Sequence, residues 1–108
     1  MTKIKIKIIY TTTDADKIAH HIGELLVKNK LSPCVQIVPK IKTYYKWKGK
    51  LESSNELLLI IKATAENVNS CVQLILYHHN YDTPEIIVSE GDILHDKYAD
   101  WFLDISNK

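Results

Sequence analysis

The longest extended segment of the chain is residues 34–47, which read CVQIVPKIKTYYKW. The segment is rich in Val, Ile, Thr and Tyr, the residues that fit the pleated surface of a β-strand. At about 3.3 Å per residue it would extend to roughly 45 Å, whereas a compact domain of about 100 residues has a radius of gyration of about 13 Å. A hairpin that contains this strand must therefore project beyond its own core.

Two residues shape this predicted hairpin. Gly49 follows the segment and is expected to turn the chain, and Pro39 lies inside the segment without an N–H to donate. We therefore expect a bulge or an edge position at Pro39. The projecting part would expose an apolar ribbon and an unpaired strand edge, which favours a closed oligomer whose hairpins pair across subunits. The ribbon consists of Ile41, Tyr44, Tyr45 and Trp47.

The segment before the hairpin predicts a strand and a helix. Ile4, Ile6 and Ile8 alternate with lysines, the period-two pattern of a half-buried strand. Apolar residues then recur at helical spacing from Asp16 to Lys30, and Thr13 or Asp14 can cap this helix.

The segment after the hairpin predicts the rest of the fold. A strand at Glu56–Ala63 precedes a helix that Thr64 can cap, and a short strand is expected at Glu85–Val88. A turn at Gly91-Asp92 then leads to a final amphipathic segment, residues 94–105. The order β-α-β-β-α-β plus a C-terminal helix predicts an α+β, ferredoxin-like sandwich with an antiparallel sheet and one long hairpin.

Composition indicates which classes of partner are excluded. The 108 residues carry 14 basic and 13 acidic side chains, for a formal charge of +1, and every basic residue among them is lysine. Arginine is the side chain suited to bidentate recognition of phosphates and base edges. The small net charge and the absence of arginine argue against a nucleic-acid-binding protein.

The chain also lacks signals for membrane insertion or export. Its apolar runs, such as Leu57–Ile61, are too short to span a bilayer, and the first residues do not form a signal peptide. Cys34 and Cys71 have no CxxC spacing, so we interpret them as buried thiols in a reducing compartment. These features predict a cytoplasmic protein.

Three stretches resemble the CutA family of divalent-cation tolerance proteins. They are residues 34–52, Ile61-Lys62, and residues 78–101, which begin HHNYDTPEI. The similarity runs from Thr11 to Trp101 and predicts that residues 1–108 form one CutA-like domain. It implies a homotrimer built on the long hairpins and a role linked to divalent metals, copper especially and zinc less so.

Two positions depart from the family pattern. Asn80 stands where family members usually have proline after the second histidine, and Tyr10 stands where certain bacterial members have cysteine. Metal binding by those members is attributed to that cysteine with a histidine and a glutamate of the third stretch. Without the soft thiolate, the case for copper(I) or mercury is weaker here.

The predicted metal ligands are His78, His79 and Glu85. Imidazole and carboxylate groups suit Zn(II), Cu(II) or Ni(II), and a loop that folds back could bring one histidine near Glu85. The alternative is a structural role, because histidines at the end of a helix also stabilise its dipole when protonated. The adjacent pair His20-His21 is interpreted as part of a solvated helix face.

The resemblance implies a second site, a cleft near the subunit interface. Its residues would be Lys62, Glu52, His79, Tyr81 and Glu85, and its walls would be Tyr44, Trp47 and Trp101. One interpretation is a salt-bridge network that fixes the register of the trimer. The other is a site for an anionic small molecule, with Lys62 and His79 as cationic contacts.

These observations leave three hypotheses for function. The first is a trimeric protein of metal binding and tolerance, and the second is a regulatory trimer, similar in architecture to PII proteins, that binds an anionic metabolite or an unidentified partner protein. The third is an assembly module whose trimer is itself the function. An enzyme is not expected, because the sequence has no GxSxG, P-loop or HExxH motif.

Overall fold

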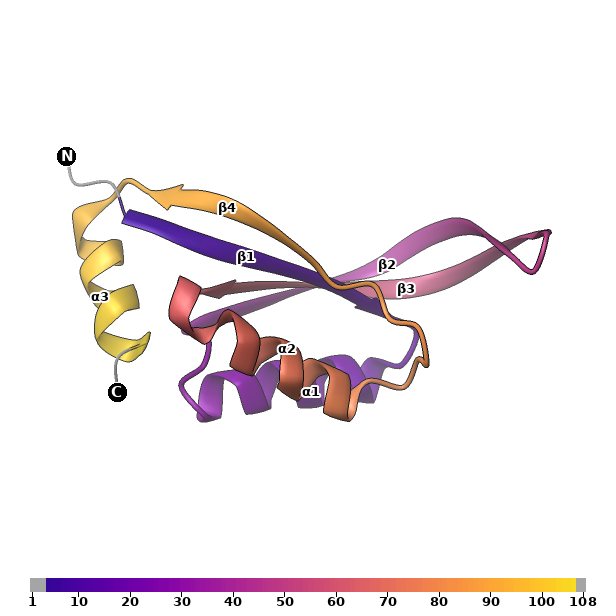
Figure 1. Cartoon of the computed structure of the whole chain (residues 1–108), viewed down its shortest axis with the longest axis horizontal. Coiled ribbons are helices and arrows are strands. Elements are labelled where there is room, and N and C mark those ends of the chain that lie inside the picture. Colours follow the sequence, from indigo (N-terminus) through magenta and orange to yellow (C-terminus); the bar gives the residue numbers. More distant parts are fainter. Residues whose placement is uncertain (1–3, 107–108) are drawn as a thin grey trace.

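The chain forms a four-stranded antiparallel sheet with two helices on one face and a third helix at one end (Figure 1). This computed structural model describes residues 4–106. The strand order is β2-β3-β1-β4, which confirms the predicted ferredoxin-like α+β fold. The elements are β1 (Ile4–Thr13), α1 (Asp16–Lys28), β2 (Cys34–Trp47), β3 (Lys50–Ala63), the 3-10 turn η1 (Ala65–Asn67), α2 (Val68–His78), β4 (Ile87–Ile93) and α3 (Asp96–Ser106).

The main core lies between the sheet and helices α1 and α2, which cover the same face (Figure 1). Helix α1 ends two residues before the predicted Lys30, because Lys30 adopts a φ of 59° that a right-handed helix cannot accommodate. None of the helices in the described residues is both long and apolar enough to cross a membrane. The central side chains of the core are Ile9, Ile22, Leu26, Leu59, Ile61 and Ile75, all fully buried.

Strand β1 contributes to two cores, one on each face of the sheet. Ile9 packs under α1 and α2, whereas Ile6 lies in a second cluster with Ile93, Ala99 and Phe102. Helix α3 lies at one end of the molecule (Figure 1), and its Ala99 and Phe102 side chains pack in this second cluster. The predicted alternation of Ile4, Ile6 and Ile8 therefore marks the α3 side of the strand.

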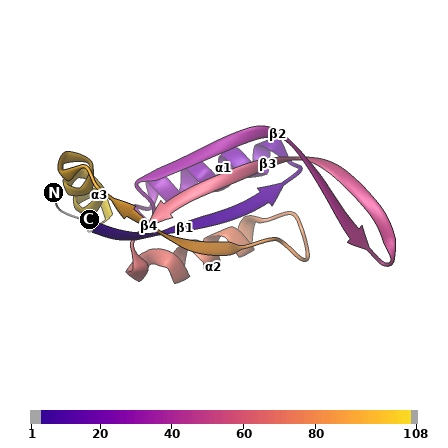
Figure 2. The ribbon, with the colours of Figure 1, turned by 90° about the horizontal axis from the view of Figure 1, so that it is seen from above.

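The β2–β3 hairpin projects far beyond the rest of the fold, as predicted (Figure 2). The molecule measures 49 × 25 × 22 Å, with a radius of gyration of 14.9 Å. Trp47 pairs with Lys50 across a two-residue turn in which Lys48 and Gly49 both have positive φ, 50° and 79°. Strand β3 begins at Lys50 and not at the predicted Glu56, because backbone pairing with β2 makes a strand of its polar first half.

A bulge interrupts β2 at Pro39, and β2 is also an edge strand, so both predictions for this residue are confirmed. Val38 pairs with Leu58 and Ile41 with Glu56, which leaves Pro39 and Lys40 opposite Leu57. Lys40 accommodates the extra residue with a φ of 61°. Such a bulge bends a strand and increases its twist, so it directs the outer half of the hairpin.

The predicted end of the sheet at Val88 and the predicted turn at Gly91-Asp92 are wrong. Strand β4 continues through both positions, and Gly91 pairs with Ile6 of β1. A Cβ atom at Gly91 would lie 2.9 Å from the Cδ1 atom of Ile8. The Ile8 side chain therefore occupies the space beside Gly91, and this glycine does not mark a turn.

Candidate functional site

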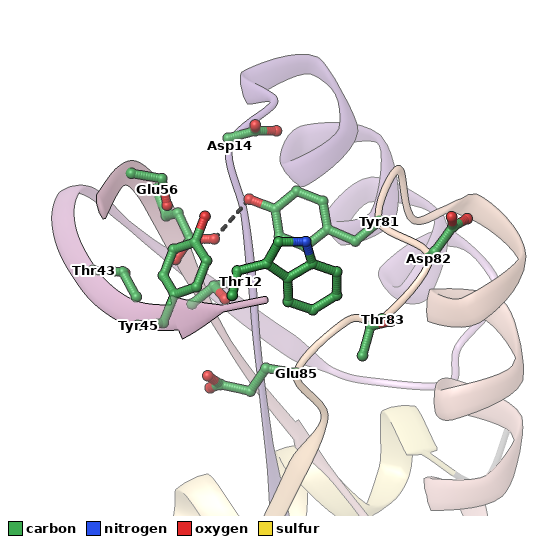
Figure 3. Close-up of a pocket in the computed structure, with 11 residues that line it drawn as sticks. Thr12, Asp14, Thr43, Tyr45, Glu56, Tyr81, Asp82, Thr83 and Glu85 are labelled. Atoms are coloured by element: carbon green, nitrogen blue, oxygen red, sulfur yellow. Dashed lines mark hydrogen bonds between the residues drawn. The ribbon is translucent and has the colours of Figure 1, made fainter. Parts of the chain in front are cut away.

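A cavity of about 520 Å³ lies between the hairpin and the loop that joins α2 to β4 (Figure 3). Its walls come from three parts of the chain: the end of β1 with Asp14, the hairpin, and the loop residues from Tyr81 to Glu85. Four of the lining residues are carboxylates, namely Asp14, Glu56, Asp82 and Glu85. Three are aromatic, namely Tyr45, Trp47 and Tyr81, and the other four are threonine or serine, namely Thr12, Thr43, Ser54 and Thr83.

The deepest carboxylate of the cavity belongs to Glu56. Its side chain is only 6% exposed, and the Tyr81 hydroxyl donates a hydrogen bond of 2.6 Å to its Oε2 atom (Figure 3). Burial raises the pKa of the Tyr81 phenol above its usual value, and the hydrogen bond to Glu56 and the negative charges of Glu56 and Asp14 raise it further. Tyr81 therefore stays protonated and acts as a donor at neutral pH.

His79 fastens the loop that carries Tyr81. Its Nε2 atom lies 2.9 Å from the carbonyl oxygen of Thr12, and its Nδ1 atom accepts a hydrogen bond of 3.0 Å from the Tyr81 N–H. The two contacts together require the tautomer that is protonated on Nε2. Because both ring nitrogens are engaged, His79 holds the loop and has no free nitrogen for a metal ion in this conformation.

Asn80 strengthens the same attachment. Its Nδ2 atom donates to Asp14 at 2.9 Å, and its Oδ1 atom accepts from the Thr13 hydroxyl at 2.5 Å. The residue that departs from the family pattern therefore ties the loop to the end of β1. Asp14 is held in the cavity wall by this contact.

The three predicted metal ligands lie in three different environments. His79 is engaged as described, and Glu85 is exposed in the wall of the cavity. His78 instead contacts His21 of α1, with 4.9 Å between the ring centroids. Within residues 4–106 no group of three or more His, Cys, Asp or Glu residues is close enough to hold a metal ion.

The residues predicted for the interface cleft are also separated within one protomer. Trp47 and Tyr81 line the cavity, whereas Tyr44 and Glu52 lie on the hairpin outside it. Trp101 belongs to α3, at the end of the molecule opposite the hairpin (Figure 1). A cleft that contains both Trp47 and Trp101 would therefore need a second protomer.

Lys62 lies outside the cavity as well. It is half-buried on β3, where it pairs with Ile8 on one side and Cys34 on the other. None of the residues that line the cavity is a lysine, an arginine or a histidine. The charge of the cavity therefore does not suit the anionic ligand that the sequence left open.

Several lining residues were not predicted from the sequence, although three of them had a usable signal. Side chains alternate along a strand, so Thr43 and Tyr45 share the face of Trp47, whereas Tyr44 points to the other face. Glu56 opens a strongly apolar strand, and a carboxylate in such a position needs a partner. No comparable signal marks Asp14 or Asp82, which reach the cavity only through the fold of their loops.

The fold and the hairpin define a ferredoxin-like α+β protein with one greatly extended β-hairpin. Residues 7–104 match the sequence model of the family described as CutA1 divalent ion tolerance protein. The chain therefore belongs to the CutA1 family.

Individual relatives agree with this assignment. The chain is 35% identical over 96 residues to the CutA homolog of Xenopus laevis, which covers 89% of the chain and 64% of that protein. It is 31% identical over 98 residues to the divalent-cation tolerance protein CutA of Thermus thermophilus, covering 88% of the chain and 92% of that protein. The crystal structure of CutA1 from Ehrlichia chaffeensis superposes with a TM-score of 0.87 at 33% identity and covers 94% of each chain. The chain spans only about half the length of the Arabidopsis thaliana and mouse relatives, 52% in each case.

Proposed function

We propose that this protein binds divalent transition-metal ions, copper in preference to zinc, as a homotrimer, and that it thereby contributes to tolerance of those ions. The match to the divalent ion tolerance family over residues 7–104 carries the proposal. The role is one of binding, without catalytic turnover. One feature of the protomer supports the proposed assembly, and another supports the proposed metal binding.

The hairpin supports assembly. Tyr44, Trp47 and Leu51 are 67%, 51% and 74% exposed on the projecting part, and the outer edge of β2 has no strand partner within the described chain. An exposed apolar ribbon along a free strand edge is the arrangement that pairs with another chain. A neighbouring protomer would bury these side chains and pair the edge.

The His21–His78 contact supports metal binding. It brings two imidazoles from α1 and α2 together, and His21 is exposed while His78 is half-buried. Neutral imidazole is a good ligand for Cu(II) and Zn(II), and Cu(II) binds a given nitrogen site more tightly. Water molecules or side chains of another protomer would complete the coordination sphere.

Light scattering coupled to gel filtration tests assembly. We expect the wild type to elute with three times its 12.4 kDa chain mass, with and without Cu(II). Leu51→Glu should shift the protein towards the monomer, because it places a charge on the exposed apolar surface of the hairpin. Leu76→Glu, a matched change at an exposed leucine on α2, should not. A monomeric wild type at all concentrations would contradict the trimer.

Isothermal titration with Cu(II) and Zn(II) tests metal binding. We expect tighter binding of Cu(II), and a loss of about tenfold or more in Cu(II) affinity in both His21→Ala and His78→Ala. His95→Ala is the matched control at an exposed histidine beside α3 and should leave the affinity unchanged. The variants His79→Ala and Glu85→Ala are titrated in the same way. A Cu(II) affinity that is the same in all of these variants as in the wild type would contradict a specific site.

A further inference from the structure

The His21–His78 pair is incomplete as a metal site within one molecule. It supplies two imidazoles, whereas a closed site for Zn(II) or Cu(II) has about four ligands. Within residues 4–106 no third His, Cys, Asp or Glu side chain lies close enough to join the pair. His79, the next residue, has both ring nitrogens engaged by the loop. The pair therefore provides half of a metal site.

The position of the pair leaves it open to a second molecule. Helices α1 and α2 form a layer on one face of the sheet, and the contact of His21 with His78 joins these two helices (Figure 1). The proposed trimer instead uses the hairpin and the free edge of β2. His21 is exposed, so its ring can turn towards an ion without disturbing the core. An ion bound by the pair can therefore also contact ligands from outside the trimer.

A second copy of this chain can approach the helix layer, but little holds it there without an ion. The formal charge is only +1 per chain, so electrostatic repulsion between copies is weak. The exposed large apolar side chains on the two helices are Val27, Leu76 and Tyr77. Three side chains fall far short of the roughly 1,000 Å² that a specific interface buries. Contact between copies at this face would therefore depend on the metal ion.

We propose that one divalent transition-metal ion bridges two copies of this protein through their His21–His78 pairs. Each copy supplies two neutral imidazole nitrogens, and four nitrogen ligands suit both Cu(II) and Zn(II). Equal contributions make the contact twofold symmetric. Tyr77 would lie in this contact, because it is 84% exposed and its ring centroid is 4.9 Å from that of His78. The inference rests on the proposed metal binding at this pair and names the partner that completes the site.

Static light scattering during a metal titration tests the bridge. Cu(II) is added to the metal-free, full-length protein, and the average particle mass is compared with its metal-free value. With four ligands per ion and two per chain, the mass should be greatest at about one ion per two chains. It should fall again in excess Cu(II), because each pair then takes an ion of its own. EDTA should restore the metal-free mass.

Variants identify the residues that form the bridge. His21→Ala and His78→Ala should each abolish the increase in mass. His20→Ala is the matched control at an exposed histidine of the same helix, which lines a groove against β2, and should leave the increase unchanged. Tyr77→Lys keeps both ligands but places like charges in the contact. It should suppress the increase in mass, while calorimetry still detects Cu(II) binding at one ion per chain.

The possible failures point to different proposals. Saturable Cu(II) binding by the wild type at one ion per chain, without any increase in mass, would overturn the bridge and leave the proposed metal binding intact. An increase in mass that persists in both His21→Ala and His78→Ala would also overturn it, because the ion would then link copies elsewhere. The absence of Cu(II) binding in calorimetry would contradict the proposed metal binding itself, and the bridge with it.

Discussion

Single residues define the chemistry of the cavity and of the loop beside it. Glu56 supplies the buried charge, Tyr81 supplies its one donor, and His79 holds the Tyr81 backbone against β1. The Tyr81–Glu56 and His79–Thr12 contacts join residues from distant parts of the chain. The loop after α2 is therefore a fixed wall of the cavity.

Tyr81→Phe should destabilise the protein, because it leaves the buried Glu56 carboxylate without a donor from the described chain. We expect a loss of about 1–3 kcal/mol in the free energy of unfolding near neutral pH. Urea denaturation measures this loss. Tyr77→Phe changes a tyrosine that is 84% exposed, so it serves as the control and should leave the free energy of unfolding unchanged.

The contribution of the Tyr81–Glu56 hydrogen bond to stability should depend on pH. The folded-state pKa of Tyr81 is raised above the usual tyrosine value of 10.0, so its stabilising contribution is complete below pH 10.0 and is lost as the pH rises through the folded value. The difference in stability between the wild type and Tyr81→Phe should therefore narrow above pH 10.0. A difference that widened in alkali would contradict the assigned hydrogen bond.

Cys71 should be chemically inert in the folded protein. It is fully buried, its thiol donates to the Leu31 carbonyl oxygen at 3.5 Å, and burial raises its pKa to about 11. Since the thiolate is the reactive form, a Cys34→Ser variant should show no labelling by a thiol reagent at neutral pH until it is unfolded. Rapid labelling of the native Cys34→Ser variant would contradict this prediction, because it would show that the reagent reaches Cys71 in the folded protein.

At the scale of elements, the hairpin depends on its turn and its bulge. The turn uses positive φ at Lys48 and Gly49, which matches the twist of the two strands, and the bulge at Pro39 and Lys40 redirects β2. These two features position Tyr45 and Trp47 in the wall of the cavity.

Gly49→Ala should therefore destabilise the hairpin. A Cβ atom at this position meets nothing within 4 Å, so the cost comes only from the φ of 79° and should be about 1–2 kcal/mol. Lys48→Asn is the contrasting change, and it should be neutral or stabilising because asparagine tolerates positive φ. Thermal denaturation of the two variants measures both effects. An unchanged melting temperature in Gly49→Ala would contradict the positive φ assigned to this turn residue.

At the scale of the whole molecule, the elongated protomer is the main argument for assembly. The hairpin and α3 lie at opposite ends of a molecule 49 Å long, so Trp47 and Trp101 can share a site only between protomers (Figure 1). The predicted trimer and its interface cleft rest on this arrangement.

Unfolding should depend on protein concentration if the trimer forms. Dissociation accompanies unfolding in such an assembly, so the melting temperature should rise when the concentration rises by about a hundredfold. Scanning calorimetry on the wild type and on Leu51→Glu measures this, and the dependence should weaken in the variant. A wild-type melting temperature independent of concentration would contradict an assembly that dissociates on unfolding.

Local patterns in the sequence determined the order of the elements and the presence of the long hairpin. The alternation at Ile4–Ile8, the extended composition of residues 34–47, and the positions of Pro39 and Gly49 depend on near neighbours in the chain. Such patterns encode secondary structure directly, because side-chain direction repeats with a fixed period. The fold class could therefore be predicted.

Tertiary structure alone decided which distant side chains meet. Glu56 meets Tyr81, His21 meets His78, and the Ile8 side chain packs beside Gly91, although each pair is far apart in sequence. Tertiary packing also recruited Asp14 and Asp82 into one acidic cavity and engaged both nitrogens of His79. These contacts depend on how whole elements pack against one another, and no local period in the sequence records that arrangement.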